Sequence, residues 1–122
     1  MTQEQKTLLM RDLCARLPYG VKISVDDRIE TLEGIDMLDN VVSYDCFLSS
    51  DIEDVKPYLL PLSSMTEEQK EEHKDLLDNQ YLGLDGNGNV FTLQDFYCKY
   101  HLDYRGFIPT GFAKDATGKN IY

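Results

Sequence analysis

The period of the hydrophobic residues changes at residues 18–20, and this change fixes the class of fold. Before it, leucines recur at helical spacing, at Leu9, Leu13 and Leu17. A proline and a glycine then end the helix, and over residues 21–25 apolar and polar side chains alternate as in a half-buried strand. A helix over residues 3–17 followed directly by strands predicts an α+β domain.

Two turn signals divide the segment that follows. Asp26 with Asp27, and Asp39 with Asn40, are residues that favour tight turns. They separate the strand at residues 21–25 from apolar stretches within residues 29–35 and 41–47. Since consecutive strands joined by short turns pair with one another, we expect a three-stranded antiparallel meander.

Cap signals mark two helical segments in the middle of the chain. Ser50 and Glu53 have the spacing of a capping box, which predicts one or two helical turns that Pro57 interrupts. Thr66 and Gln69 have the same spacing and open a helix that runs to about Asp78. This second helix carries few apolar residues, so we expect it to lie on the surface.

The last third of the chain predicts a hairpin and an aromatic helix. Apolar residues at 81–84 and 90–93 flank the turn-forming residues 85–89. Residues 94–102 then form a short helix rich in aromatic side chains, and the tail is mostly ordered loop with one turn of helix. The chain of 122 residues has the length of one domain with one core, so residues 1–122 form a single domain.

Charge and composition exclude several classes of function. The formal charge is −10, and residues 26–54 hold ten acidic residues against Arg28 alone. No stripe of lysine and arginine is present to neutralise phosphates, so we expect no nucleic-acid partner. No apolar run reaches the roughly 20 residues that a membrane helix needs, and the N-terminal segment lacks the apolar centre of a signal peptide. We therefore expect a cytoplasmic protein that does not associate with membranes.

The three cysteines lie far apart and do not form a disulfide or metal framework. An odd number of scattered cysteines, Cys14, Cys46 and Cys98, favours reduced and mostly buried thiols. Cys98 and His101 have a spacing that places both on one helical face, where they form a possible metal-ligand or nucleophile pair. No further ligands are paired with them, so packing explains both residues more simply.

A second metal motif is incomplete. Asp85, Asn87 and Asn89 match the first, third and fifth positions of a calcium-binding loop. The glycine and glutamate that should follow are replaced by Val90 and Phe96. Turn formation explains these residues, and we expect neither a metal nor a cofactor.

Aromatic residues are concentrated near the C-terminus and supply the candidate binding residues. Nine of the thirteen Phe and Tyr residues lie in residues 79–122. Some of these rings must fill the core, and the others are typical of a protein-binding surface. The candidates for contact with a partner are Tyr97, Tyr100, Tyr104 and Arg105.

Arg105 leaves two alternatives open. It follows Tyr104 in a loop that Gly106 turns, where a guanidinium is well placed to recognise a carboxylate of a partner. Alternatively, Arg105 pairs with Asp95 or Asp103 and merely fixes the loop.

Three segments resemble a group of small bacterial proteins. Residues 10–21, residues 55–68 and residues 101–108 together are similar to proteins without assigned activity that gut Bacteroidetes and their prophages encode. The resemblance implies a bacterial cytoplasmic or phage-accessory setting and supplies no catalytic residues.

These observations favour a non-catalytic protein-interaction module, such as a prophage or mobile-element accessory protein. The acidic segment, the aromatic C-terminal region and the lack of a catalytic motif all point in this direction. The alternative is a small hydrolytic or metal-assisted enzyme, because the many carboxylates include possible catalytic pairs.

Overall fold

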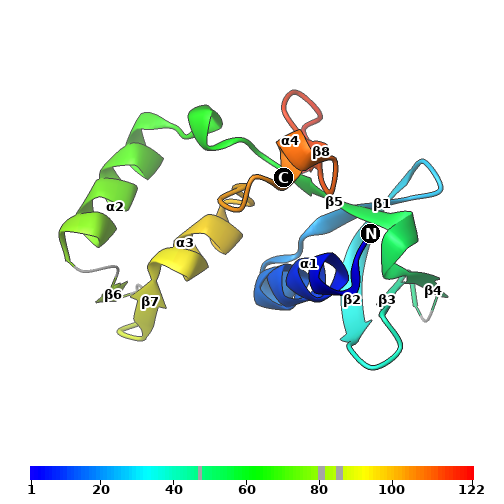
Figure 1. Ribbon diagram of the computed structural model, residues 1–122. Helices are drawn as coiled ribbons and strands as arrows, with labels where there is room; N and C mark the ends of the chain where they lie inside the picture. The colour runs from blue at the N-terminus through cyan, green and yellow to red at the C-terminus, as the bar shows by residue number, and fades with distance from the viewer. Residues whose placement is uncertain (47, 80–81, 85–86) are drawn as a thin grey trace.

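A computed structural model describes residues 1–46, 48–79, 82–84 and 87–122 (Figure 1). The α-helices are α1 (Gln3–Arg16), α2 (Glu67–Asp78), α3 (Leu93–Lys99) and α4 (Phe107–Thr110), and the 3-10 turns are η1 (Leu17–Tyr19), η2 (Ile52–Asp54) and η3 (Leu62–Ser64). The strands are β1 (Lys22–Val25), β2 (Arg28–Asp36), β3 (Val41–Tyr44), β4 (Leu48–Asp51), β5 (Val55–Leu59), β6 (Leu82–Leu84), β7 (Val90–Thr92) and β8 (Lys114–Asp115). The predicted α+β fold is confirmed.

The predicted meander is present inside a wider sheet. β1, β2 and β3 pair antiparallel in chain order. Among the described residues, the sheet has six strands in the order β4-β3-β2-β1-β5-β8, with β8 parallel to β5. The turn at Asp26 and Asp27 has φ values of 49° and 63°, the left-handed geometry that joins adjacent strands tightly.

A bulge in β2 explains why its hydrophobic pattern is irregular. The pairing with β3 shifts between Leu32 and Gly34, so Glu33 is the extra residue. The extra residue interrupts the two-residue alternation of the strand. Leu32 and Ile35 therefore pack on the same core although they are three residues apart, while Ile29 is exposed.

The helical turns predicted around Ser50 are wrong in part. Asp51 caps η2 by accepting a hydrogen bond of 3.0 Å from the Glu53 amide, whereas Ser50 lies in β4. Pro57 lies within β5 instead of ending a helix. The strand tolerates this proline because its pairing with β1 ends at Pro57 and its pairing with β8 begins at Tyr58.

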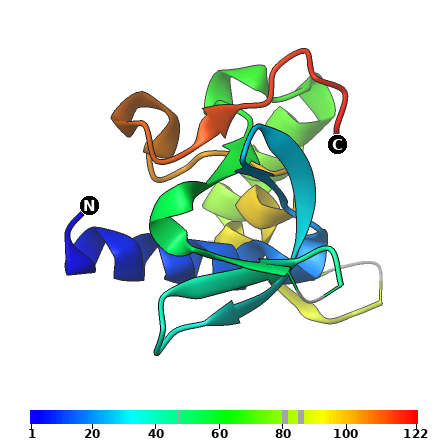
Figure 2. The same ribbon diagram turned by 90° about the vertical axis from the view of Figure 1, so that its right-hand side faces the viewer.

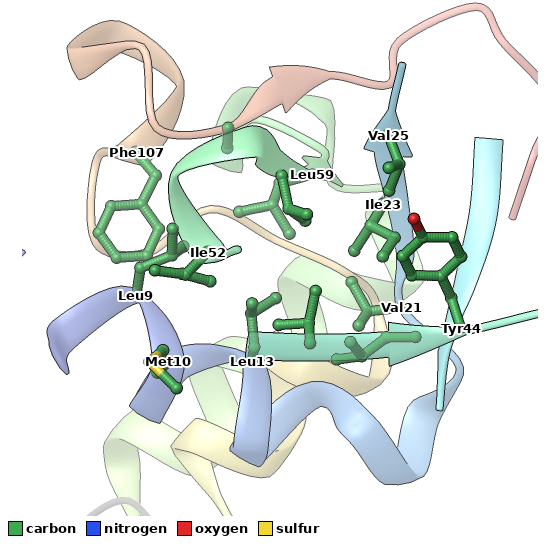
Figure 3. Packing of buried hydrophobic residues seen from close by; sticks show 14 residues of the cluster. Leu9, Met10, Leu13, Val21, Ile23, Val25, Tyr44, Ile52, Leu59 and Phe107 are labelled. Atoms are coloured by element: carbon green, nitrogen blue, oxygen red, sulfur yellow. The ribbon is translucent and has the colours of Figure 1, made fainter. Parts of the chain in front are cut away.

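The buried apolar residues form two clusters, where the sequence predicts one core. The sheet core holds one face of the sheet against α1, which contributes Leu9, Met10 and Leu13 (Figures 2 and 3). The helical core is centred on Leu76, Phe96 and Leu102 and lies between α2 and α3, to one side of the sheet in Figure 1. The chain therefore folds as two lobes with α1 and α3 in contact.

The helical lobe also contains the helix and the hairpin that the sequence predicts. The capping box of Thr66 and Gln69 is confirmed, and α2 ends at Asp78 as expected. β6 and β7 pair antiparallel, as the hairpin prediction requires. The predicted turn residues 85–86 and the predicted strand residues Tyr81 and Phe47 lie outside the described residues.

The expectation of mostly buried thiols is wrong. Cys98 is buried, but Cys14 and Cys46 are exposed. Cys14 lies in α1, and Cys46 occupies a turn with a φ of 55°.

Candidate functional site

The aromatic helix α3 begins at a capping box that the sequence analysis did not identify. The Thr92 hydroxyl accepts the Asp95 amide at 3.1 Å, and the Asp95 carboxylate accepts the Thr92 amide at 2.9 Å. The helix thus starts at Leu93 and ends at Lys99, which shortens the predicted span of residues 94–102. This start places Phe96 in the helical core and the candidate residues Tyr97 and Tyr100 beside α2.

Tyr97 and Tyr100 connect α3 to α2 through their hydroxyl groups. The Tyr97 hydroxyl and His73 Nε2 share a hydrogen bond of 2.9 Å, and the Tyr100 hydroxyl donates to Glu72 Oε2 at 2.8 Å. Burial, followed by the hydrogen bond to Glu72, raises the pKa of Tyr100. Both rings are half-buried, so their edges pack in the protein while part of each ring reaches solvent.

The other two candidates, Tyr104 and Arg105, belong to a polar network between the lobes. Arg105 Nε donates to Asp12 Oδ1 at 3.0 Å, and Arg16 Nε donates to Asp12 Oδ2 at 2.7 Å. The Tyr104 ring stacks on Tyr97 at a centroid distance of 4.8 Å, and the guanidinium of Arg105 lies over the Tyr104 ring, 4.8 Å from its centroid. We call Asp12, Arg16, Tyr104 and Arg105 the junction network.

Arg105 is paired, but with neither of the two aspartates suggested by the sequence. Asp95 caps α3, and Asp103 accepts the amides of Phe107 and Ile108 at 2.8 Å each, which fixes the start of α4. The Arg105 side chain is 27% exposed, so one side of it still faces solvent. Contact between these residues and a partner stays a prediction.

The junction network buries charge at the contact between α1 and residues 101–105. The side chains of Asp12 and Arg16 are 0% exposed, and Arg16 Nη2 also donates to the Leu102 carbonyl at 2.7 Å. Two guanidiniums thus surround one carboxylate, which offsets the cost of removing the charges from water. Burial, and then the nearby Asp12 charge, raises the pKa of Tyr104.

Cys98 and His101 do not form a reactive pair. Burial raises the pKa of the Cys98 thiol to about 11, so the thiol stays protonated and is a weak nucleophile near neutral pH. Burial lowers the pKa of His101 to about 4, and its ring stacks on Tyr122 at a centroid distance of 3.5 Å. In the described part of the chain, no three His, Cys, Asp or Glu side chains are placed to hold a metal ion.

A groove lies between α2 and the β6–β7 hairpin. Its volume is about 150 Å³, and its lining consists of Glu72, Asp75, Leu76, Asn79, Gly83, Leu84 and Phe91. Leu84 is paired across the hairpin with Val90, and the two side chains are 72% and 66% exposed. An apolar pair on a short hairpin is therefore open to solvent beside a groove that two carboxylates border.

The sequence contained signals for some of the features that its analysis missed. Asp12 and Arg16 lie at the helical spacing that also joins Leu9 and Leu13, which places all four on the buried face of α1. The groove has no such signal, because residues of α2 and of both hairpin strands create it together, and no local pattern specifies how these elements pack.

Comparisons with known proteins assign no family or function to this chain. No protein-family model matches the chain, and no curated protein or solved structure shows significant similarity to it. The resemblance to Bacteroidetes and prophage proteins therefore stays a prediction. Across the described residues, no helix has both the length and the apolar character needed to cross a membrane.

Proposed function

We propose that this protein is a non-catalytic interaction module whose contact surface is the groove between α2 and the β6–β7 hairpin. The observation that supports this proposal most strongly is the exposed pair Leu84 and Val90. Apolar side chains gain free energy when a partner removes them from water, roughly 25 cal/mol for each Å² buried. Exposed apolar side chains that gather beside a groove mark a protein-binding surface more often than singly scattered ones do.

The size of the groove favours protein contact over catalysis. A volume of about 150 Å³ is smaller than the roughly 300–1,000 Å³ of pockets that bind cofactors and drug-sized substrates. A single side chain of a partner fits such a space. The charged residues of the groove, Glu72 and Asp75, belong to its lining, and Glu72 accepts a hydrogen bond from the Tyr100 hydroxyl.

The predicted contact residues fit this proposal to different degrees. Tyr100 lies at the margin of the groove through its bond to Glu72, and Tyr97 lies on the same helix. Tyr104 and Arg105 are engaged in the junction network, so a partner there would use the exposed side of the Arg105 guanidinium. The prophage or mobile-element setting is part of the proposal only through the sequence resemblance.

The test is to capture partners in the cell with variants of the exposed pair. Tagged wild-type protein and the double variant Leu84→Ser, Val90→Ser are cross-linked in bacterial cells, and the captured proteins are quantified. We expect the amount of at least one captured protein to fall at least tenfold with the double variant. The reason is that truncating an interface anchor costs about 2 kcal/mol or more of binding free energy. Both side chains are exposed, so the melting temperature should stay close to that of the wild type.

Leu38→Ser is the matched control. Leu38 is 94% exposed and lies in the turn that joins β2 to β3, on the other lobe. Removing it changes exposed apolar area without touching the groove. If the double variant and the control capture the same proteins in the same amounts as the wild type, the proposed function is wrong.

A further inference from the structure

The groove is sized for one apolar side chain. A cavity of roughly 150 Å³ lined by apolar residues holds a six-carbon ring, and this groove has a volume of about 150 Å³ with Leu76, Leu84 and Phe91 in its lining. A leucine or phenylalanine side chain fills that space, whereas an alanine leaves most of it empty. The apolar part of the ligand is therefore a single anchor residue.

The charges around the groove determine what must flank the anchor. Glu72 and Asp75 line it, and α2 as a whole carries six acidic residues against Lys70 and Lys74. Among the described residues, no cation pairs with Asp75. Lys99 lies over the rings of Phe91 and Tyr100, 5.6 and 5.0 Å from their centroids, so the α3 side of the groove carries a positive charge. An acidic border attracts lysine and arginine and repels glutamate and aspartate.

Together, the anchor volume and the border charge define a partner. We propose that the groove binds a segment of another protein that presents a leucine or phenylalanine next to a lysine or arginine, which faces the acidic α2 side of the groove. This inference rests on the proposed function and adds the chemistry of the partner to it. The net charge of −10 acts in the same direction, because it speeds the approach of a basic partner.

A defined peptide set tests this inference. Nine fluorescent peptides share one neutral scaffold and combine a central Leu, Phe or Gly with flanking Lys, Gln or Glu, and their binding is measured by fluorescence anisotropy at low and high salt. We expect the Lys-flanked Leu and Phe peptides to bind at least tenfold more tightly than the Gln-flanked ones. The Glu-flanked peptides and those with a central Gly should show no saturable binding, and added salt should weaken the binding of the Lys-flanked peptides.

Two variants connect the binding to the groove. Asp75→Asn should weaken the binding of the Lys-flanked peptides at least fivefold and leave the binding of the Gln-flanked ones unchanged. The substitution removes a charge and keeps the shape of the side chain. Asp39→Asn, in the turn between β2 and β3, is the matched control and should change neither. Leu84→Ser should weaken every peptide that binds.

The outcomes separate this inference from the proposed function. If Gln- or Glu-flanked peptides bind as tightly as Lys-flanked ones, or if none of the nine binds, the inference is overturned. The proposed function still stands in either case if the Leu84→Ser, Val90→Ser variant loses captured proteins in the cell. Sedimentation velocity tests whether the occupant of the groove is a second copy of this chain. Leu8 and Arg11 of α1 are both exposed and supply an apolar residue and a cation. A dimer that Leu84→Ser and Leu8→Ser both abolish would assign the groove to self-association and overturn the inference.

Discussion

Replacing Asp12 by asparagine should be among the most damaging changes at a polar position of this protein. Asp12 accepts Arg16 Nε at 2.7 Å and Arg105 Nε at 3.0 Å, and it is 0% exposed. The substitution keeps the shape of the side chain and removes its charge. The Arg105 side chain is 27% exposed and can turn toward solvent, but Arg16 is 0% exposed and stays buried without its counter-ion.

The expected cost follows from that buried guanidinium. Removing one partner of a buried ion pair costs about 3–5 kcal/mol, which is a large part of the roughly 5–15 kcal/mol that stabilises a domain. At roughly 4 °C for each kcal/mol in a domain of this size, the melting temperature should fall by about 12 °C or more. Arg105→Ala should cost less, about 1–2 kcal/mol, because Arg16 still neutralises Asp12.

Urea denaturation of four variants measures these differences. The double variant Asp12→Asn, Arg105→Ala should be less destabilised than the sum of the single variants, since the two side chains share one hydrogen bond. Lys70→Ala is the control, because its pair with Glu67 at 3.3 Å is exposed and contributes about 0–1 kcal/mol. A cost below about 1 kcal/mol for Asp12→Asn would refute the structural role of the junction network.

Three further changes have predicted outcomes. The unfolded His101 binds a proton below its ordinary pKa of 6.5 and the folded one only below about 4, so the free energy of unfolding should fall by up to about 3 kcal/mol as pH decreases through this window. His101→Asn, which suits the left-handed φ of 58°, should remove that part of the slope in urea titrations at several pH values. Asp103→Ala should lower stability by about 2 kcal/mol or more in the same assay, because the amides of Phe107 and Ile108 lose their acceptor. Thr66→Ala should cost about 1 kcal/mol through the lost cap of α2, and an unchanged urea midpoint would contradict this value.

Local signals made much of the fold predictable from the sequence. The capping box of Thr66 placed the start of α2, because the side chain and the amide that form such a box lie only three residues apart. The turn at Asp26 and Asp27 was predictable for the same reason. Each of these features depends on neighbouring residues alone.

Features that depend on distant residues were not predictable. β4 and β5, on either side of η2, join the sheet because β3 and β1 offer unpaired edges, and the local cap signal at Ser50 carries no information about those edges. Arg105 pairs with a residue 93 positions away, so the sequence suggested only its neighbours Asp95 and Asp103. The division into two cores likewise follows from how α2 and α3 pack, which no local pattern specifies.

The candidate site shows the same division. The concentration of aromatic residues identified Tyr97 and Tyr100, whose helix borders the second lobe. The exposure of Leu84 and Val90 was not predictable, because alternating apolar residues in a hairpin are usually covered on one face.

A photo-cross-linking amino acid at position 90 tests the central claim of a binding groove most directly. The same amino acid at position 38 and at position 105 supplies two comparisons, the first on an exposed turn and the second in the junction network. We predict a covalent adduct with one protein from position 90, formed through a segment that contains lysine or arginine beside a leucine or phenylalanine. An adduct from position 38 or 105 without one from position 90 would contradict the claim.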